Sequence, residues 1–476
     1  MPRTRSPGRW KGGWVKSVNI VRIPSAADGS KQGIDDYLAR GGRLEDLEIL
    51  PFEGGWLPPQ GWPVLPQQAL QGIAGEVVGA ISPNTESDPV AILTLFLSAY
   101  GNIIGQGAHF VVEGDTHYCK IWPVLVGESS LARKGTAQGR VNRVLAQVDE
   151  HWYYNCQAQG LSSGEGLIYH VRDEKTKTNK EGQEVVVDDG VIDKRLMLTE
   201  PEFAGPLTVM QREGNTLSVV LRMAWDNATL QTLTKNSPAR STGSHITIAA
   251  HTNQEELIKH LTSAKLGGGV GNRFFFLLIR RSKLLPHGGK EDVLPEDLVE
   301  RLRLTIAFGR NERHIYLSEQ PEEEYGGRSA TKLWEVLYPD LSRGEAGLFG
   351  VVTSRAEAQV RRFATIYAAL ERSREVQIRH LLAGLSLWDY SRQSSYLIFK
   401  ARTGDEVADE ILHALQDAEQ GLSLSEISNH FNRNVKASRI RAALKQLHQD
   451  GWARVEKRQP DGPGRPEERW FASVPE

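Results

Sequence analysis

Val124-Leu-Val-Gly-Glu-Ser-Ser-Leu-Ala-Arg-Lys-Gly-Thr136 is the stretch that decides the fold. It continues an apolar run from Ile121, and this run predicts a buried strand that ends before Gly127. A small polar loop follows and delivers Arg133 and Lys134. Residues 138–148 then carry apolar side chains at helical spacing. The stretch therefore predicts a strand, a short loop and a helix in direct succession.

This succession is typical of a P-loop, in which backbone N–H groups and a helix N-terminus cradle phosphate oxygens while a lysine bridges them. The usual pattern has five residues between its first glycine and the lysine, and Ser or Thr directly after the lysine. Here six residues, 128–133, intervene, and a glycine follows the lysine. A strand–turn–helix corner without a ligand is the alternative. We predict an ATP site formed by Gly127, Arg133, Lys134, Gly135 and Thr136, with Gly135 or Thr136 at the position that backs Mg²⁺.

A second predicted strand, within residues 195–203, ends in two acidic residues, Glu200 and Glu202. P-loop ATPases need acidic groups to hold the magnesium ion and to orient the attacking water. We assign Glu200 to the metal, together with Thr136, and Glu202 to the water. A strand capped by solvated acids is the alternative.

A third predicted strand, residues 245–250, leads to Asn253 and a helix, and then to Arg273 before a fourth apolar strand, 275–279. A polar residue at a strand tip can sense the γ-phosphate, and an arginine after the next helix can reach the ATP of a neighbouring subunit. Arg355 begins a helical segment, and we predict that it offers its guanidinium to the phosphates from a lid above the nucleotide. A surface position at a helix start is the alternative for Arg355.

The C-terminal segment 405–476 predicts three helices followed by a basic hairpin, which is the pattern of a winged helix. From Arg433 onward the chain has 10 Lys or Arg against 6 Asp or Glu. Such a basic patch suits contacts with DNA phosphates, although winged helices also dock on proteins. The predicted DNA-binding residues are Lys436, Arg439, Arg441, Lys445, Lys457, Arg458 and Arg465.

Composition sets broader bounds. A chain of 476 residues predicts two or three domains, and its net charge of -2 means that any nucleic-acid surface must be local. Cys119 and Cys156 show no metal or redox spacing, which favours a reducing cytoplasm. No apolar run reaches the length of a membrane span, and the basic N-terminus lacks the apolar core of a signal peptide. We therefore expect a cytoplasmic protein without a membrane partner.

With these motifs assembled, the chain resembles the AAA-type ATPase half of primase–helicase proteins from phages, plasmids and integrative elements, many known only as a domain of unknown function. The likeness runs from about residue 67 to 471 and rests on residues 133–136, 193–196, 200–203, 212–216, 272–274 and 388–390. The series Asn253, Arg273-Phe274 and Arg355 also looks like the sensor, arginine-finger and lid-arginine series of minichromosome-maintenance helicases.

The resemblance implies an α/β fold with a P-loop NTPase (AAA+/RecA-like) core at 66–285, a helical lid at 286–402 and a winged-helix domain at 403–476. Residues 17–23 predict one strand, and Lys31 to Leu38 resembles the end of a primase-like (TOPRIM-like) domain, so residues 1–65 are expected to be its remnant or tail.

The function that the resemblance implies is an ATP-dependent DNA helicase or translocase in the replication of a mobile genetic element. ATP and Mg²⁺ would be its cofactors, and its partners would be DNA, further copies of the chain in a ring such as a hexamer, and a separate primase. The alternative is a DNA-binding replication initiator or regulator that acts through the winged helix without hydrolysing ATP. A nucleotide-dependent defence or signalling switch fits the same motifs.

Overall fold

A computed structural model describes residues 61–232, 240–261, 269–290, 294–311, 314–345, 347–400, 403, 405–418, 420–458 and 467–473, with the backbone of 20–22 and 48–50. The chain divides into two compact units, Met1–Trp62 and Pro63–Glu476. In the first unit, β1 (Ile20–Arg22) and β2 (Glu48–Leu50) pair antiparallel, so a strand does form within residues 17–23. The primase-like stretch Lys31 to Leu38 lies outside the described residues.

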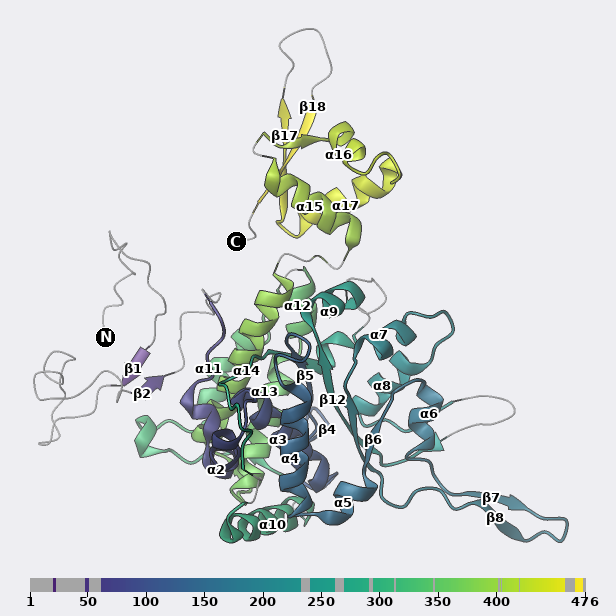
Figure 1. Cartoon of the computed structure of the whole chain (residues 1–476), viewed down its shortest axis with the longest axis vertical. Coiled ribbons are helices and arrows are strands. Elements are labelled where there is room, and N and C mark those ends of the chain that lie inside the picture. Colours follow the sequence, from purple (N-terminus) through teal and green to yellow (C-terminus); the bar gives the residue numbers. More distant parts are fainter. Residues whose placement is uncertain are drawn as a thin grey trace, which may run out of the picture. The chain divides into compact units, whose positions relative to one another are not determined.

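A parallel sheet of five strands forms the centre of the second unit (Figure 1). Across the sheet the order is β13 (Phe274–Leu278), β5 (Trp122–Val126), β12 (His245–Thr252), β9 (Arg195–Glu200) and β6 (Gln157–Gln159). Counted along the chain, this is the order fifth, first, fourth, third, second. Helices cover both faces, so β5, β12 and β13 are buried along their whole length, and β5 and β13 are apolar throughout rather than alternating. This confirms an α/β fold with a parallel sheet.

The helices between these strands lie on both faces of the sheet. On one face α3 (Pro89–Ile104) packs against α4 (Lys134–Ala146) and the central strands, and α5 (Glu150–Asn155) follows α4. Figure 1 shows α6 (Gly164–Tyr169), α7 (Ala204–Met210) and α8 (Leu217–Trp225) on the other side of the sheet. There α9 (Gln254–Leu261) packs against α7. Because α3 is buried all round, most of its side chains are apolar, and a polar one such as Asn102 is hydrogen-bonded within the core.

The helices of the predicted lid share the core of the sheet. Among them, α14 (Ile378–Phe399) packs against α13 (Ala356–Leu370) and β13. The Tyr390 hydroxyl donates to the Leu278 carbonyl at 2.6 Å, and the Ser394 hydroxyl accepts from the Leu278 N–H at 3.0 Å. Residues of α13 and α14 belong to the same apolar cluster as those of α3, α4 and β5. The core and the predicted lid therefore pack continuously, and no break in packing separates them at residue 285, where the boundary was expected.

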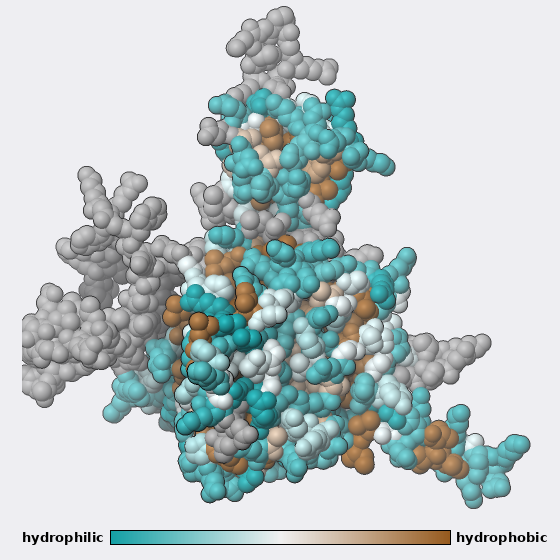
Figure 2. All heavy atoms as spheres, viewed as in Figure 1, coloured by the Kyte–Doolittle hydropathy of each residue, from teal (hydrophilic) through white to brown (hydrophobic). Residues whose placement is uncertain are grey.

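The other elements before the C-terminal segment flank the sheet, and some of them, such as α2 and α10, contribute buried residues to the same apolar cluster. They are η2 (Gln67–Leu70), α2 (Gly72–Ile81), η3 (Ser82–Asn84), β3 (His109–Val112), β4 (Asp115–Tyr118), β7 (Lys175–Thr178), β8 (Glu184–Asp188), β10 (Leu230–Gln231), β11 (Arg240–Ser241), η4 (Gly271–Arg273), α10 (Glu296–Asn311), β14 (Tyr316–Leu317), η5 (Glu323–Tyr325), α11 (Ala330–Leu341), α12 (Gly347–Thr353) and β15 (Glu375–Val376). The β7–β8 hairpin exposes Val185, Val186 and Val187 to solvent (Figure 2).

The C-terminal segment forms a helical group with its own small sheet. It comprises α15 (Glu406–Asp417), β16 (Leu422–Ser423), α16 (Leu424–His430), α17 (Ala437–Gln449), β17 (Ala453–Arg458) and β18 (Glu467–Ala472). The strands pair antiparallel in the order β16-β18-β17, and the three helices enclose a separate apolar cluster. Ser423 and Glu426 form the capping box that begins α16. Three helices and a hairpin are therefore present, as the periodicity predicts.

Within the described ranges, none of the helices combines the length and the apolar character that crossing a bilayer requires.

Candidate functional site

The loop between β5 and α4, residues 127–133, has a compact and irregular backbone. Ser130 and Arg133 both have φ near +60°, in the left-handed region. The Ala132 N–H donates to the Glu128 carbonyl at 3.1 Å. A Cβ on Gly127 would lie 2.5 Å from the Ile279 carbonyl oxygen, so this position requires glycine. The loop is thus a built turn whose start is fixed by close packing.

Lys134 is the first residue of α4, and its side chain folds back across the loop. The ammonium donates to the Gly127 carbonyl at 2.5 Å and, more weakly, to the Glu128 carbonyl at 3.4 Å. Burial lowers the pKa of Lys134, and the negative charge of Glu256 opposes this shift. A half-buried cation therefore lies between the loop and the N-terminus of α4, where helix N–H groups lack intrahelical acceptors.

The other predicted ATP-binding residues have different surroundings. Arg133 forms an ion pair with Glu86 (Nε to Oε2, 2.7 Å), which ties the loop to the segment before α3. Gly135 and Thr136 are both in the first turn of α4, and the space around the Gly135 Cα is open. Thr136 is exposed there and carries the one hydroxyl of that turn.

Glu200 is the last residue of β9 and is buried. Its carboxylate accepts a hydrogen bond from the Leu161 N–H at 2.6 Å, in the loop after β6. Burial raises the pKa of Glu200, while backbone hydrogen bonds from Leu161 and Gly160 lower it. Glu202 is exposed two residues later. Both predicted acids therefore lie at the carboxyl edge of the sheet, with one strand, β12, between them and β5.

The end of β12 lies directly beside the loop, because Thr252 pairs with Val126 and its carbonyl accepts from the Gly127 N–H at 3.1 Å. The Asn253 side chain accepts from the Glu256 N–H at 2.9 Å and so caps α9. His251 is buried with no hydrogen-bond partner for Nε2 among the described residues. Burial, and then the charge of Lys134, lower the pKa of His251 to about 4. A neutral imidazole therefore stands near the ammonium.

The position of this site follows from the topology of the sheet. The connection from β5 to β6 crosses the sheet in one direction, and the connection from β12 to β13 crosses it in the other. Because such crossovers are right-handed, α4 and α9 lie on opposite faces. The neighbouring carboxyl ends of β5 and β12 thus flank a topological switch point, where open α/β sheets bind their ligands.

Arg273 and Arg355 lie together, but at the opposite edge of the sheet. Arg273 precedes β13, whose first residue pairs with Trp122 at the start of β5. Asp226 joins the two arginines, at 2.5 Å from Arg273 Nη2 and 3.9 Å from Arg355 Nη1. The length of β5, roughly 17 Å for five residues, separates this amino edge from Lys134. Arg355 is therefore not above the loop of its own chain, where the lid prediction placed it.

Two more basic side chains, both buried, lie near Arg273 and Arg355, and burial lowers the pKa of one of them, Lys120, well below its usual range. The Lys120 ammonium donates to the Asn227 side chain at 2.8 Å, and the Arg362 guanidinium stacks 3.9 Å from the centre of the Trp225 ring. A cavity of about 680 Å³ beside them is lined by Arg355, Arg362, His117 and Asp226, among others. Burial lowers the pKa of Arg362 to about 9. The two arginines of this lining are matched by two carboxylates, Asp115 and Asp226, so the cavity carries no excess of positive charge.

The predicted DNA-binding residues of the C-terminal segment are partly exposed and partly paired. Lys436, Arg441 and Lys445 are exposed at the start and along one side of α17, and Lys457 is exposed on β17. Arg439 is also exposed, but it forms an ion pair with Asp405 at 2.6 Å. The side chain of Arg458, and Arg465 as a whole, lie outside the described residues.

No protein-family model matches this chain, and a search of curated proteins finds no similar sequence.

Two features of the site escaped the sequence prediction. The first is the place of His251 near Lys134, which depends on strand pairing that local sequence does not specify. The second is the proximity of Arg273 and Arg355, which are far apart along the chain and meet through Asp226.

Proposed function

We propose that residues 127–136 form a nucleoside-triphosphate site and that the chain is a P-loop ATPase that acts on DNA. One observation carries the proposal. The Lys134 ammonium lies between a tight loop and the first turn of α4, beside the switch point of a parallel sheet. A lysine, loop N–H groups and a helix N-terminus converging at such a point suit the β- and γ-phosphates of ATP. On binding, the phosphates would replace the loop carbonyls as partners of the ammonium.

The residues present also suit Mg²⁺. This ion prefers oxygen ligands, and the Thr136 hydroxyl and the Glu200 carboxylate supply them at the carboxyl edge. When bound, Mg²⁺ neutralises phosphate charge. Glu202 is exposed at the same edge and would orient the attacking water, and Asn253 would contact the γ-phosphate if its side chain leaves the cap of α9.

The arginines suit a role between subunits. Because Arg273 and Arg355 lie at the edge opposite Lys134, they would serve the ATP of an adjacent copy in a ring such as a hexamer. Arg355 and Arg362 both line the cavity at this edge, where a guanidinium can contact an anion.

The C-terminal segment supports DNA as the substrate. Three helices with a small antiparallel sheet are the elements of a winged helix, and the exposed cations of α17 and β17 would contact phosphates. The activity we propose is therefore that of an ATP-driven DNA helicase or translocase of a mobile element, with a primase supplied by another protein.

Steady-state ATP hydrolysis with and without single-stranded DNA tests this proposal. We expect DNA to stimulate hydrolysis by the wild-type protein, and both Lys134→Ala and Arg355→Ala to abolish it. An equal mixture of the two variants should regain activity, because one contributes an intact loop and the other an intact arginine to a shared site. Lys332→Ala, at an exposed lysine of α11, is the control. Inactive wild-type protein under ring-forming conditions would contradict the proposal.

One observation favours a second candidate, a DNA-binding initiator or regulator that does not hydrolyse ATP. Six residues separate Gly127 from Lys134, and Gly135 stands where P-loops carry a hydroxyl. Under this alternative the wild-type protein binds specific duplex sites tightly and shows no hydrolysis that Lys134→Ala reduces.

A further inference from the structure

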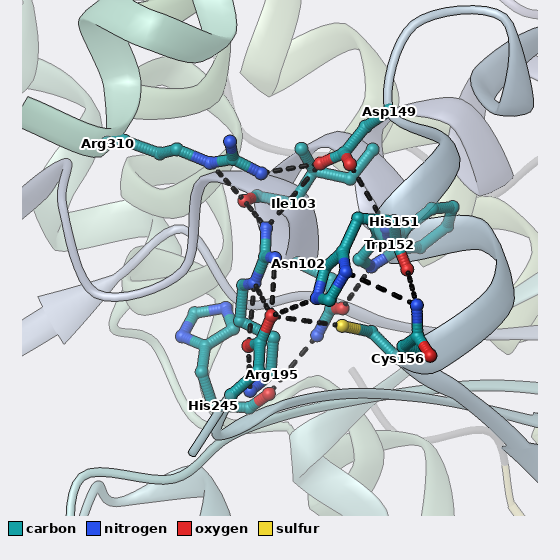
Figure 3. Close-up of polar contacts among 11 residues, drawn as sticks. Asn102, Ile103, Asp149, His151, Trp152, Cys156, Arg195, His245 and Arg310 are labelled. Atoms are coloured by element: carbon teal, nitrogen blue, oxygen red, sulfur yellow. Dashed lines mark hydrogen bonds and ion pairs between the residues drawn. The ribbon is translucent and has the colours of Figure 1, made fainter.

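Three side chains that can bind a metal meet at the amino edge of the sheet, away from Lys134. His151 lies on α5, Cys156 directly precedes β6, and Asp193 lies just before β9. Asp193 Oδ2 is 3.4 Å from His151 Nε2 and 3.3 Å from Cys156 Sγ. The three ligand atoms all lie within 4.8 Å of one another. Figure 3 shows His151 and Cys156 beside the polar group that includes Arg195.

These separations are close to those of a zinc site. Bonds of about 2.0 to 2.3 Å in a tetrahedron place neighbouring ligand atoms roughly 3.4 to 3.6 Å apart. Two of the three pairs already meet this requirement. The side chain of His151 is 62% exposed, so it can move the remaining distance without disturbing the core.

We propose that His151, Cys156 and Asp193 bind a Zn²⁺ ion through Nε2, Sγ and one carboxylate oxygen, with water at the fourth position. The ligand set decides the metal. A thiolate and an imidazole favour a borderline-soft ion, whereas Mg²⁺ takes oxygen ligands. The site is therefore distinct from the magnesium site proposed beside Lys134, and it does not depend on the proposed function.

The surrounding residues would orient the ligands. Arg195 donates to both oxygens of Asp193, with Nη2 to Oδ2 at 2.6 Å and Nε to Oδ1 at 2.9 Å. These bonds hold the carboxylate in place; although burial opposes it, they lower the pKa of Asp193 and keep it charged. On the other side, Asn155 Nδ2 lies 3.3 Å from His151 Nδ1. Because an imidazole bound through Nε2 carries its proton on Nδ1, the Asn155 amide would turn its oxygen toward this N–H to accept it. Metal-binding carboxylates and imidazoles usually have such outer partners.

Cys156 must lose its proton before it can bind the ion. Burial, and then the negative charge of Asp193, raise the pKa of the Cys156 thiol to about 12. Without a cation, the thiol stays protonated and donates to Asp193. Zn²⁺ would displace this proton to solvent and form the Zn–S bond, so binding releases one proton and strengthens as pH rises. The ion would fasten α5 to the beginning of β9, joining Cys156 to a residue 37 positions further along the chain.

Cobalt substitution in the full-length chain tests the site. We expect chelator-treated wild-type protein to bind one Co²⁺ and to develop a near-ultraviolet thiolate-to-cobalt band, which one equivalent of Zn²⁺ removes. Cys156→Ser should lose the band. Cys119→Ser is the matched control, because Cys119 is the other cysteine of the chain and is also buried, and it should keep the band.

His151→Ala gives a second variant that leaves the fold intact, because His151 is exposed. We expect it to weaken zinc affinity at least tenfold, on the order of the effect of altering a metal site's outer partners. Zinc should also raise the melting temperature of the wild-type protein more than that of His151→Ala. The proposal is overturned if wild-type protein develops no thiolate band, or if Cys156→Ser or His151→Ala binds zinc as tightly as wild type.

Discussion

Gly127 and Gly135 lie on either side of the bend before α4, but their surroundings differ. A methyl group on Gly127 would meet the Ile279 carbonyl at 2.5 Å and the Ala132 Cβ at 2.7 Å, whereas the space around Gly135 is open. We expect Gly127→Ala to reduce the free energy of unfolding by about 1–3 kcal/mol through overpacking. Gly135→Ala should leave the free energy of unfolding unchanged or raise it by up to about 1 kcal/mol, because alanine favours a helix more than glycine does. Urea denaturation of both variants measures the difference, and equal stabilities would refute this account of the loop.

His251 makes stability depend on pH. Its pKa is about 4 in the folded protein, below the usual 6.5, because of burial. As pH falls through 6.5 the unfolded chain takes up this proton first, so stability falls between pH 6.5 and 4. One such group contributes a slope of about 1.4 kcal/mol per pH unit.

We expect His251→Gln to remove this share of the slope, measured by urea denaturation at several pH values. His287→Gln, at an exposed histidine, is the control. An unchanged slope in His251→Gln would show that His251 is not the group responsible.

At the scale of elements, apolar runs predicted four of the five strands of the central sheet. The fifth, β6, has the polar sequence Gln157–Gln159 and is held by its backbone pairing with β9, so no local pattern could reveal it. The order of the strands also depends on long-range pairing. For this reason the sequence identified Lys134 and Arg273 as candidates but could not place them at opposite edges of one sheet.

The helical region shows the same limit. The sequence predicted the helical segment that Arg355 begins, but not the elements that cover it, which are α14 and the core around β13. Likewise the cysteine spacing indicated no metal site, whereas folding brings Cys156 to His151 and Asp193. Local sequence patterns do not show which segments, distant along the chain, come together in the fold.

Asp226 connects three elements, since it follows α8 and binds Arg273 at the end of η4 and Arg355 at the start of α13. Arg273 is 5% exposed, so without Asp226 its charge would be buried and unpaired. We expect Asp226→Ala to lower the free energy of unfolding by about 1–3 kcal/mol, less than for a fully buried pair because Asp226 is half-exposed. Asp226→Asn should lower the free energy of unfolding by less, because its amide oxygen can still accept a hydrogen bond. Urea denaturation measures these changes. An Asp226→Ala variant as stable as the wild-type protein would contradict a structural role for the Asp226–Arg273 pair.

At the scale of the whole molecule, the net charge of -2 hides a basic C-terminal segment. Of its exposed cations, Lys436, Arg441 and Lys445 share the start and one side of α17. Replacing all three with alanine should weaken DNA binding uniformly across sequences. The salt slope of the affinity should fall by about 0.9 for each DNA phosphate that the variant no longer neutralises.

Fluorescence anisotropy with labelled duplex at several salt concentrations measures both quantities. Lys332→Ala should bind as wild type does, because this lysine lies on α11, outside the basic segment. A salt slope that is unchanged in the triple variant would place the DNA-binding surface elsewhere on the molecule.

The central claim is that Lys134 and its loop bind the phosphates of ATP, and equilibrium binding of a fluorescent ATP analogue with Mg²⁺ tests it most directly. We expect saturable binding by the wild-type protein and by Lys332→Ala. Lys134→Ala should bind about tenfold or more weakly, because it loses a hydrogen bond between charged groups. Equal affinity in the wild-type protein and Lys134→Ala would contradict the account.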